Sequence, residues 1–256
     1  MAPATGHSGD SVQLYGLTSR DKQLVLTLWT GDPRLATRAD AAGVERIGVD
    51  LERLGKRERQ KGLGTWISPH TEADLAAVGE ALTSASLFAR LDPPHGGTPA
   101  QVERVLAAGA EVVMLPMFRT ASEVQHFVEL VGGRATVVLL LETPEAVEQA
   151  GKIAGVDGVG EIHLGLNDLT LALGLPNRFM LLTSRLAARL AATVTDAGLR
   201  FGAGGIGRAG DDSLPIPADL IYAQYARLAD WRARDENELE AARLELMQRA
   251  AACRSW

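Results

Sequence analysis

Two carboxylates, Glu142 and Asp168, stand at the ends of two strongly apolar runs. The first run covers 137–141 and reads VVLLL, and the second covers about 160–166. A helix-length segment, 144–154, separates them, and strand–helix–strand order makes a parallel pair whose strands end at the same edge of one sheet. Hard divalent cations prefer oxygen ligands. The spacing therefore predicts that Glu142 and Asp168 share a cation such as Mg2+.

A helix start explains the same residues without a metal. Thr143 would be the N-cap, Pro144 the first helical residue and Glu145 an acid in the first turn. Asp168 would likewise cap the helix that follows the second run. On the spacing alone, both interpretations stay open.

Charged residues also follow the neighbouring predicted strands. Asp50 and Glu52 stand at and just after the end of 46–50, and Arg90 ends 86–90. A structural salt-bridge network is one interpretation. The other is a catalytic set of Asp50, Glu52 and Arg90, because barrel enzymes react at this edge of the sheet. Arg90 would then hold a substrate carboxylate or a developing enolate oxygen by charge-assisted hydrogen bonds.

Uncharged strand-end residues complete the predicted substrate site. Pro116 follows the fourth strand, and backbone N–H groups of Gly165, Leu166 and Asn167, at a helix start, are expected to bind an anionic group. The glycine run 204–207 follows the seventh strand, where many barrels bind phosphate. A tight turn is the alternative interpretation of that run.

Alternating strand and helix patterns position these residues. The predicted strands are 24–29, 46–50, 86–90, 111–115, 137–141, about 160–166, 200–203 and, more weakly, 229–234. The predicted helices are 33–42, 71–82, 99–108, 121–130, 144–154, 178–197, 217–227 and 237–252. Repeated βα units predict an α/β protein with a (β/α)8 TIM barrel, imperfect at its charged eighth strand. An open doubly wound sheet is the alternative, but its G-x-G-x-x-G fingerprint does not follow the first strand.

The bulk composition limits the function classes. A chain of 256 residues with 46% hydrophobic content suits one barrel domain, 24–256, after a flexible arm, 1–23. A net charge of −6 argues against a nucleic-acid surface. No apolar run reaches the ~18 residues of a membrane span, and the N-terminus lacks the apolar core of a signal peptide. The single Cys253 fits a reducing cytoplasm.

Several stretches resemble the HpcH/HpaI aldolase and citrate lyase β-subunit-like family. They are LLLETPEAVEQA, IHLGLNDLTLALG and FARLDPP with VLAAGAEVVMLPM, and the similarity runs from about 24 to 227. The resemblance implies a phosphoenolpyruvate/pyruvate-type barrel, usually oligomeric (dimer, trimer or hexamer), often with its last helix exchanged. It also implies Mg2+- or Mn2+-dependent carbon–carbon lyase or aldolase chemistry through an enolate, on a keto acid, a β-hydroxy acid or its CoA thioester. Glu142 and Asp168 correspond to the family's metal ligands, and Arg90 to its keto-acid-binding arginine.

The chain departs from the family's HpaI type at the general base. That type has Gly-Glu-His after the second strand, whereas this chain has GVDLER at 48–53, which with Lys56 is closer to the citrate lyase type. Leu140 stands where that type has a glutamine. His70, His95 and His163 are candidate bases, although a histidine inside a strand is more typical of packing. Other expected outcomes are a thioester hydrolase, a decarboxylase, a condensing enzyme or a non-catalytic barrel subunit.

Overall fold

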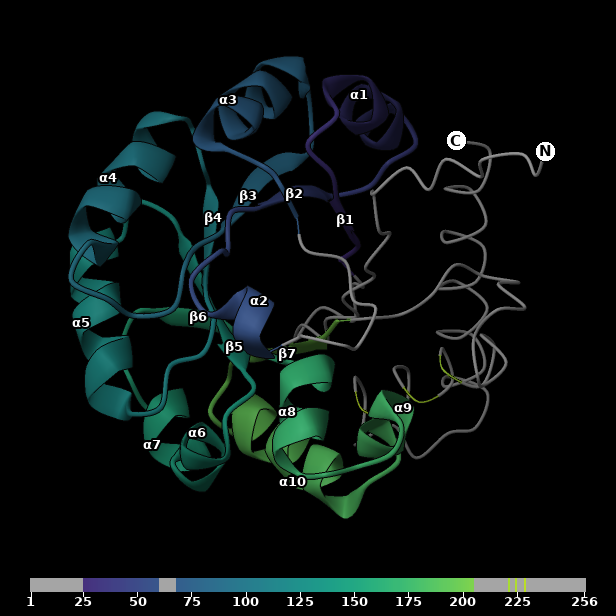
Figure 1. Ribbon diagram of the computed structural model, residues 1–256, viewed down its shortest axis with the longest axis vertical. Helices are drawn as coiled ribbons and strands as arrows, with labels where there is room; N and C mark the ends of the chain where they lie inside the picture. The colour runs from purple at the N-terminus through teal and green to yellow at the C-terminus, as the bar shows by residue number, and fades with distance from the viewer. Residues whose placement is uncertain (1–24, 60–67, 205–220, 222–223, 225–227, 229–256) are drawn as a thin grey trace.

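A parallel sheet curls around the centre of the molecule, and helices cover its outer side (Figure 1). The computed structural model describes residues 25–59 and 68–204, together with 221, 224 and 228. Within these residues seven strands pair side by side in chain order, all parallel. They are β1 (Thr27–Trp29), β2 (Arg46–Asp50), β3 (Ser86–Arg90), β4 (Val112–Leu115), β5 (Thr136–Leu141), β6 (Val159–Leu164) and β7 (Arg200–Ala203).

The helices mostly follow the strands one by one, as a parallel sheet requires. Between β1 and β5 they are α1 (Pro33–Ala41), α2 (Lys56–Arg59), α3 (Glu72–Ala81), α4 (Thr98–Ala107) and α5 (Ala121–Val131). After β5 come α6 (Pro144–Glu148), α7 (Ala150–Ala154), α8 (Leu166–Ala172), α9 (Arg178–Leu182) and α10 (Arg185–Asp196). Local sequence sets their ends: α5 begins with a capping box between Thr120 and Glu123 and is followed by Gly132 at a φ of 58°. In the described part of the chain no helix is long and apolar enough to cross a membrane.

The two faces of the sheet carry separate apolar clusters. The outer cluster joins strand residues such as Ile47 and Val49 to helix residues such as Leu75. The inner cluster contains strand residues alone: Trp29, Phe88, Val112, Met114, Val138 and Leu140. Side chains alternate between faces along a strand. The concave face is therefore filled by packed side chains and is not an open channel.

The strand register puts charged residues on this same inner face. Gly48 pairs with Phe88, and two residues further along Asp50 pairs with Arg90. Arg90 in turn pairs with Met114 of the inner cluster. Asp50 and Arg90 therefore lie at the C-terminal edge of the sheet, directly beyond the apolar layer.

A second charged group lies at the opposite end of the inner face. Arg46 donates two hydrogen bonds to Glu161, at 2.8 and 2.7 Å, and both side chains are buried. Nε2 of the fully buried His163 lies 3.2 Å from Oε2 of Glu161. Burial alone would raise the pKa of Glu161, but the hydrogen bonds from Arg46 and His163 lower it to about 2. This geometry favours a packing role for His163.

The α/β class and the parallel order are confirmed, with corrections to several boundaries. The predicted strand ending near 166 ends at Leu164, because α8 already begins at Leu166. The predicted helix 144–154 is divided at Gln149, and 178–197 is divided into α9 and α10, with Ser184 capping the second. Helix α2 lies within 51–70, where the sequence predicted neither a helix nor a strand. The arm 1–23, glycines 205 and 207, strand 229–234 and helix 237–252 lie outside the described residues, as does most of helix 217–227.

Candidate active site

Glu142 is held in a buried position directly after β5. The backbone N–H of Met117 donates to its Oε1 at 3.0 Å, and the side chain is almost fully buried. Met117 has a φ of 54°, a left-handed conformation that is uncommon for a residue with a side chain. Such strain, of about 1–3 kcal/mol, persists where the surrounding structure fixes the backbone, often at functional sites.

Gly165 makes room for the other side of Glu142. A Cβ at position 165 would lie 2.5 Å from both Cβ and Oε2 of Glu142, closer than atoms approach without moving. The N–H of Gly165 donates to the backbone oxygen of Leu141 at 3.0 Å. Gly165 therefore contributes space to the site, and its N–H is engaged in the sheet and not directed at an anion, contrary to the sequence-based expectation for this residue.

The surroundings of Glu142 oppose its negative charge. Burial raises the pKa of Glu142 well above its ordinary value, and the nearby charges of Glu52 and Asp168 raise it further. Arg90 and the Met117 N–H act in the opposite direction but do not offset these effects. The predicted carboxylates therefore converge closely enough to interact electrostatically. A cation between them would reverse this effect and favour ionised Glu142.

Asp168 lies in the first turn of α8, and Gly165 is the N-cap. The alternative in which Asp168 itself caps this helix is therefore wrong, although a carboxylate in the first turn does match the helix dipole. Oδ1 of Asp168 accepts a hydrogen bond from Nε of Arg59 at 3.1 Å. Among the described residues, Arg59 is thus the hydrogen-bond partner of the Asp168 carboxylate.

Arg90, Asp50, Glu52 and Lys56 form one buried ionic cluster. Arg90 forks onto Asp50 through Nε, at 2.8 Å, and through Nη2. Nζ of Lys56 lies 2.6 Å from Asp50 and 3.3 Å from Glu52. Burial would raise the pKa of Asp50, but the charges and hydrogen bonds of Arg90 and Lys56 bring it far below its usual range. The salt-bridge network, one of the two interpretations left open by the sequence, is present, and it lies beside Glu142 and Asp168.

Sequence reasoning missed two residues that shape this cluster, Arg59 and Met117. Arg59 joins Glu52 to Asp168, and Met117 binds Glu142 through its backbone. The guanidinium of Arg90 lies 5.3 Å from the centre of the Trp29 ring. A signal did exist for Arg59, because Glu52, Lys56 and Arg59 are spaced by four and three residues, as on one side of a helix.

The remaining predicted substrate-site residues lie at the same edge with different surroundings. Pro116 is buried beside Met117, and Leu166 is buried in the outer apolar cluster. Oδ1 of Asn167 lies 3.4 Å from Nη1 of Arg178. Pro116 follows β4 as predicted, and the backbone of Leu166 and Asn167 lies at the start of α8, where anion binding by their N–H groups stays a prediction.

The three candidate bases are placed at different points. The ring of His70 packs against Gly31, and Nδ1 of His95 lies 3.0 Å from Thr98 Oγ1 in the turn before α4. His163 is buried beside Glu161, and burial lowers its pKa. None of these contacts brings a histidine to Glu142 or Asp168.

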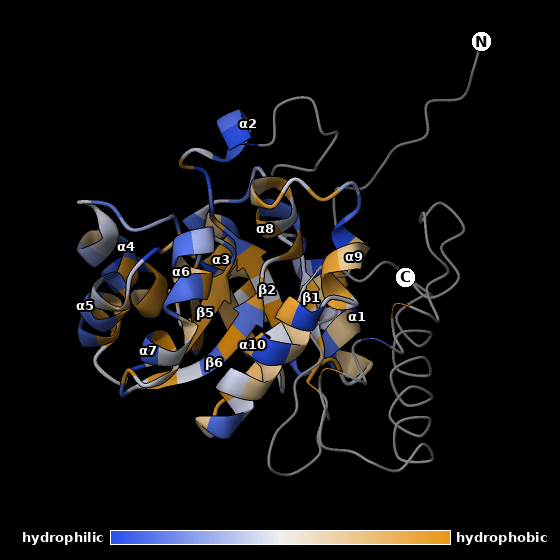
Figure 2. Ribbon diagram, turned by 90° about the horizontal axis from the view of Figure 1, so that it is seen from below, coloured by the Kyte–Doolittle hydropathy of each residue, from blue (hydrophilic) through white to orange (hydrophobic). Residues whose placement is uncertain are grey.

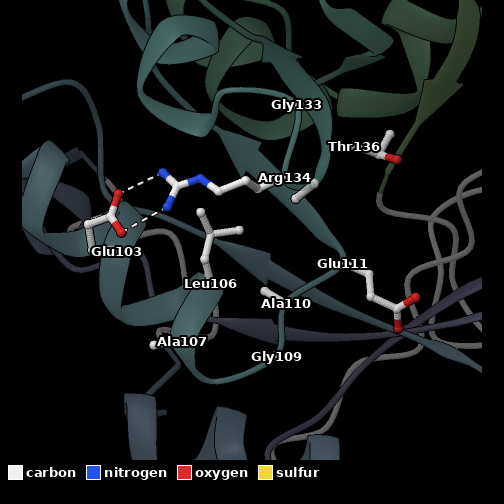
Figure 3. Close-up of a pocket in the computed structure, with 10 residues that line it drawn as sticks. Glu103, Leu106, Ala107, Gly109, Ala110, Glu111, Gly133, Arg134 and Thr136 are labelled. Carbon is white, nitrogen blue, oxygen red and sulfur yellow. Dashed lines mark hydrogen bonds and ion pairs between the residues drawn. The ribbon is translucent and has the colours of Figure 1, made fainter.

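A hollow of about 790 Å³ lies at the other edge of the sheet (Figure 3). Its lining includes Glu111, directly before β4, Thr136, the first residue of β5, and the exposed pair of Arg134 and Glu103. Because parallel strands start at the edge opposite to their ends, this hollow is remote from Glu142.

The donor set fits magnesium better than a softer metal. The described residues contain no group of three or more histidine, cysteine or acidic side chains that could enclose a metal ion. Mg2+ commonly keeps several waters and binds through one or two carboxylates, so a pair such as Glu142 and Asp168 is sufficient. The raised pKa of Glu142, which a neighbouring cation would lower, supports the same fit.

Comparison with known proteins identifies relatives of this architecture. A model of the HpcH/HpaI aldolase/citrate lyase family matches residues 32–195. A family protein from Burkholderia cenocepacia has a TM-score of 0.56 at 21% identity, over 68% of this chain and 76% of its own. The citrate lyase beta subunit from M. tuberculosis, complexed with oxaloacetate and magnesium, has 0.53 at 20%, over 90% and 95%. The citrate synthase SbnG has 0.58 at 17%, over 88% and 91%.

No curated protein matches the chain in sequence. The solved structures, at these identities, show a shared fold, and the family match covers more than half of the chain. The chain therefore belongs to the HpcH/HpaI aldolase/citrate lyase family.

Proposed function

We propose that this protein is a divalent-metal-dependent carbon–carbon lyase or aldolase acting on a keto acid, a β-hydroxy acid or its CoA thioester. The observation that carries the proposal is the convergence of Glu142, Asp168 and Arg90 at one sheet edge. Two carboxylates and a guanidinium that come from different βα units match the needs of a reaction that builds negative charge on a keto-acid oxygen. The likeness to a citrate lyase beta subunit complexed with oxaloacetate and magnesium supports this class of ligand.

Glu142 and Asp168 are the residues that would hold Mg2+ or Mn2+. Each carboxylate has one oxygen held by a protein donor, Met117 N–H for Glu142 and Arg59 Nε for Asp168. The Met117 N–H fixes the orientation of the Glu142 carboxylate as a ligand. When bound, a divalent ion would act as a Lewis acid that stabilises enolate charge.

Arg90 is the proposed substrate-binding cation. Its fork onto Asp50 and its position over the Trp29 ring fix the guanidinium before any ligand arrives. Fixed donors cost no reorganisation when charge develops on the substrate. Asp50 and Glu52 then serve chiefly to position Arg90. Because the pKa of Asp50 is depressed, this carboxylate is a weak proton acceptor, and a general base works best with a pKa near the operating pH.

The finer architectural proposal is a (β/α)8 barrel that closes after β7. The curled order of the seven described strands is the expected arrangement of such a barrel, and closure brings strand-end residues to one mouth. Exchange of the last helix within a homo-oligomer is part of the same proposal.

Metal titration and product analysis test the function. Calorimetric titration of the wild-type chain with Mn2+ should give binding that Glu142→Gln and Asp168→Asn abolish. Glu145→Gln is the matched control, because Glu145 lies nearby in α6 but its side chain is 56% exposed and faces Arg119. Incubation with Mg2+ and either free keto acids or CoA thioesters should then give products in which a carbon–carbon bond has been cleaved or formed.

The product identifies the reaction class. Release of free CoA without carbon–carbon cleavage would replace the lyase with a thioester hydrolase. A full metal response in Glu142→Gln would refute the proposed site, and absence of any metal or oxaloacetate binding would favour a non-catalytic subunit.

A further inference from the structure

Arg59 connects Glu52, just after β2, to Asp168 in α8 at the C-terminal edge of the sheet. In Figure 1 helix α2 lies within the curve of the seven described strands, and in Figure 2 it stands above the sheet on the same side as α8. From its last residue, Arg59, the guanidinium donates to Asp168 Oδ1 at 3.1 Å, to Glu52 Oε1, and to the backbone oxygen of Leu54 at 3.2 Å. The side chain is 22% exposed, so these bonds form in a partly buried setting.

At the C-terminal edge of the sheet, the acidic side chains do not all have the same number of basic partners. Lys56 and Arg90 each lie within ion-pair distance of both Asp50 and Glu52. Among the described residues, the cation in ion-pair contact with Asp168 is Arg59. The charge of Asp168 in the metal-free protein is therefore balanced chiefly by this one side chain.

A divalent ion at Glu142 and Asp168 would meet Arg59 at a shared carboxylate. Like charges in a partly buried site repel more strongly than they do in water. The ion and the guanidinium would also both interact with the Asp168 carboxylate, so each would weaken the other's interaction with it. Their occupancies of Asp168 are thus coupled with opposite sign.

We infer that Arg59 is a resident counter-cation: it neutralises Asp168 while no divalent ion is bound, and an incoming divalent ion competes with it. This inference rests on the proposed metal site at Glu142 and Asp168. It also assigns a function to α2, because this four-residue helix places the Arg59 guanidinium next to Asp168.

Removal of Arg59 has a signature that a purely structural residue would not give. The metal-free protein loses stability, because Glu52 and Asp168 lose a shared partner. Metal binding becomes tighter, because the competitor is gone. A side chain that only orients Asp168 as a metal ligand would have the opposite effect on affinity, since loss of such partners typically weakens metal binding ~10–100-fold.

The test compares Mn2+ binding of the full-length wild-type chain and Arg59→Ala, measured from the electron paramagnetic resonance signal of free Mn2+. The Kd is expected to fall about tenfold in the variant, within the usual range of coupling between sites. Thermal unfolding in a chelator should show a lower Tm for the variant, and saturating Mn2+ should raise that Tm more than it raises the wild-type value.

Two further variants separate charge from loop anchoring. Arg59→Lys keeps a positive charge but loses the guanidinium fork that donates to both Asp168 and Glu52, so its Kd for Mn2+ should lie between those of the wild type and Arg59→Ala. If Arg59→Ala does not fold, the titration of Arg59→Lys decides the inference. Arg53→Ala is the matched control, because Arg53 anchors the same loop through the backbone oxygens of Pro69 and His70. Its Kd should stay at the wild-type value.

The outcomes distinguish the inference from the proposed function. Normal Mn2+ binding by the wild type with unchanged or weaker binding by Arg59→Ala overturns the counter-cation role alone. If the wild type does not bind Mn2+, both the proposed function and the inference are overturned.

Discussion

Gly165→Ala provides a steric test of the Glu142 position. The added Cβ would lie 2.5 Å from both Cβ and Oε2 of Glu142. Restoring an ordinary contact of about 3.5 Å requires a shift of about 1 Å. The backbone at Gly165, with φ of −82° and ψ of 99°, suits any residue, so the substitution tests packing and not backbone strain.

The expected loss of stability is about 1–3 kcal/mol, the usual range for an overpacked interior. The expected loss of Mn2+ affinity is at least ~10-fold, because a displaced carboxylate no longer faces Asp168. Urea unfolding of the metal-free protein and calorimetric titration with Mn2+ measure the two effects separately.

Gly151→Ala is the matched control for this experiment. Gly151 lies within α7, and a Cβ there would meet nothing within 4 Å. Alanine should stabilise this helix by up to ~1 kcal/mol and leave Mn2+ affinity unchanged. Wild-type metal affinity in a folded Gly165→Ala protein would refute the assignment of Glu142 as a ligand.

Three other substitutions test the electrostatics. The raised pKa of Glu142 means that metal-free stability should fall as pH rises from the ordinary value of 4.5 through the higher folded pKa; Glu142→Gln should flatten this dependence in urea titrations. Glu161→Gln should cost about 3–5 kcal/mol by leaving Arg46 buried without its anion, while the Mn2+ Kd of the folded variant stays unchanged. Arg90→Lys removes the fork onto Asp50, so KM for a keto acid should rise at least ~10-fold; an unchanged KM would exclude Arg90 from substrate binding.

The strand ends were predictable because buried parallel strands leave a strong signal. Continuous apolar runs such as 137–141 have few alternative structures, and the residue after each run then falls at a known edge. This logic placed Glu142 and Arg90 correctly at one edge. It failed at the end of β6, because Leu164 and Leu166 are both apolar and no breaker separates the strand from α8 apart from Gly165.

The contacts within the site were less predictable than its location. The pairing of Asp50 with Arg90 depends on strand register, which lies in contacts between distant segments. The left-handed conformation of Met117 has no sequence signal, because methionine does not favour it. Arg59 stands in a charged loop in which apolar periodicity, the main guide to helices, is absent.

The inner apolar layer links the fold to the chemistry. Gly48 leaves no side chain beneath Trp29, and a Cβ there would lie 2.6 Å from the indole ring. The ring can therefore pack down against β2 and against Phe88, with ring centres 5.0 Å apart. From that position it supports the guanidinium of Arg90, which an aromatic face attracts. A larger residue at Gly48 would push Trp29 toward the C-terminal edge of the sheet and displace Arg90. Gly48, which has no side chain of its own, would therefore still determine where the substrate's negative charge can be held.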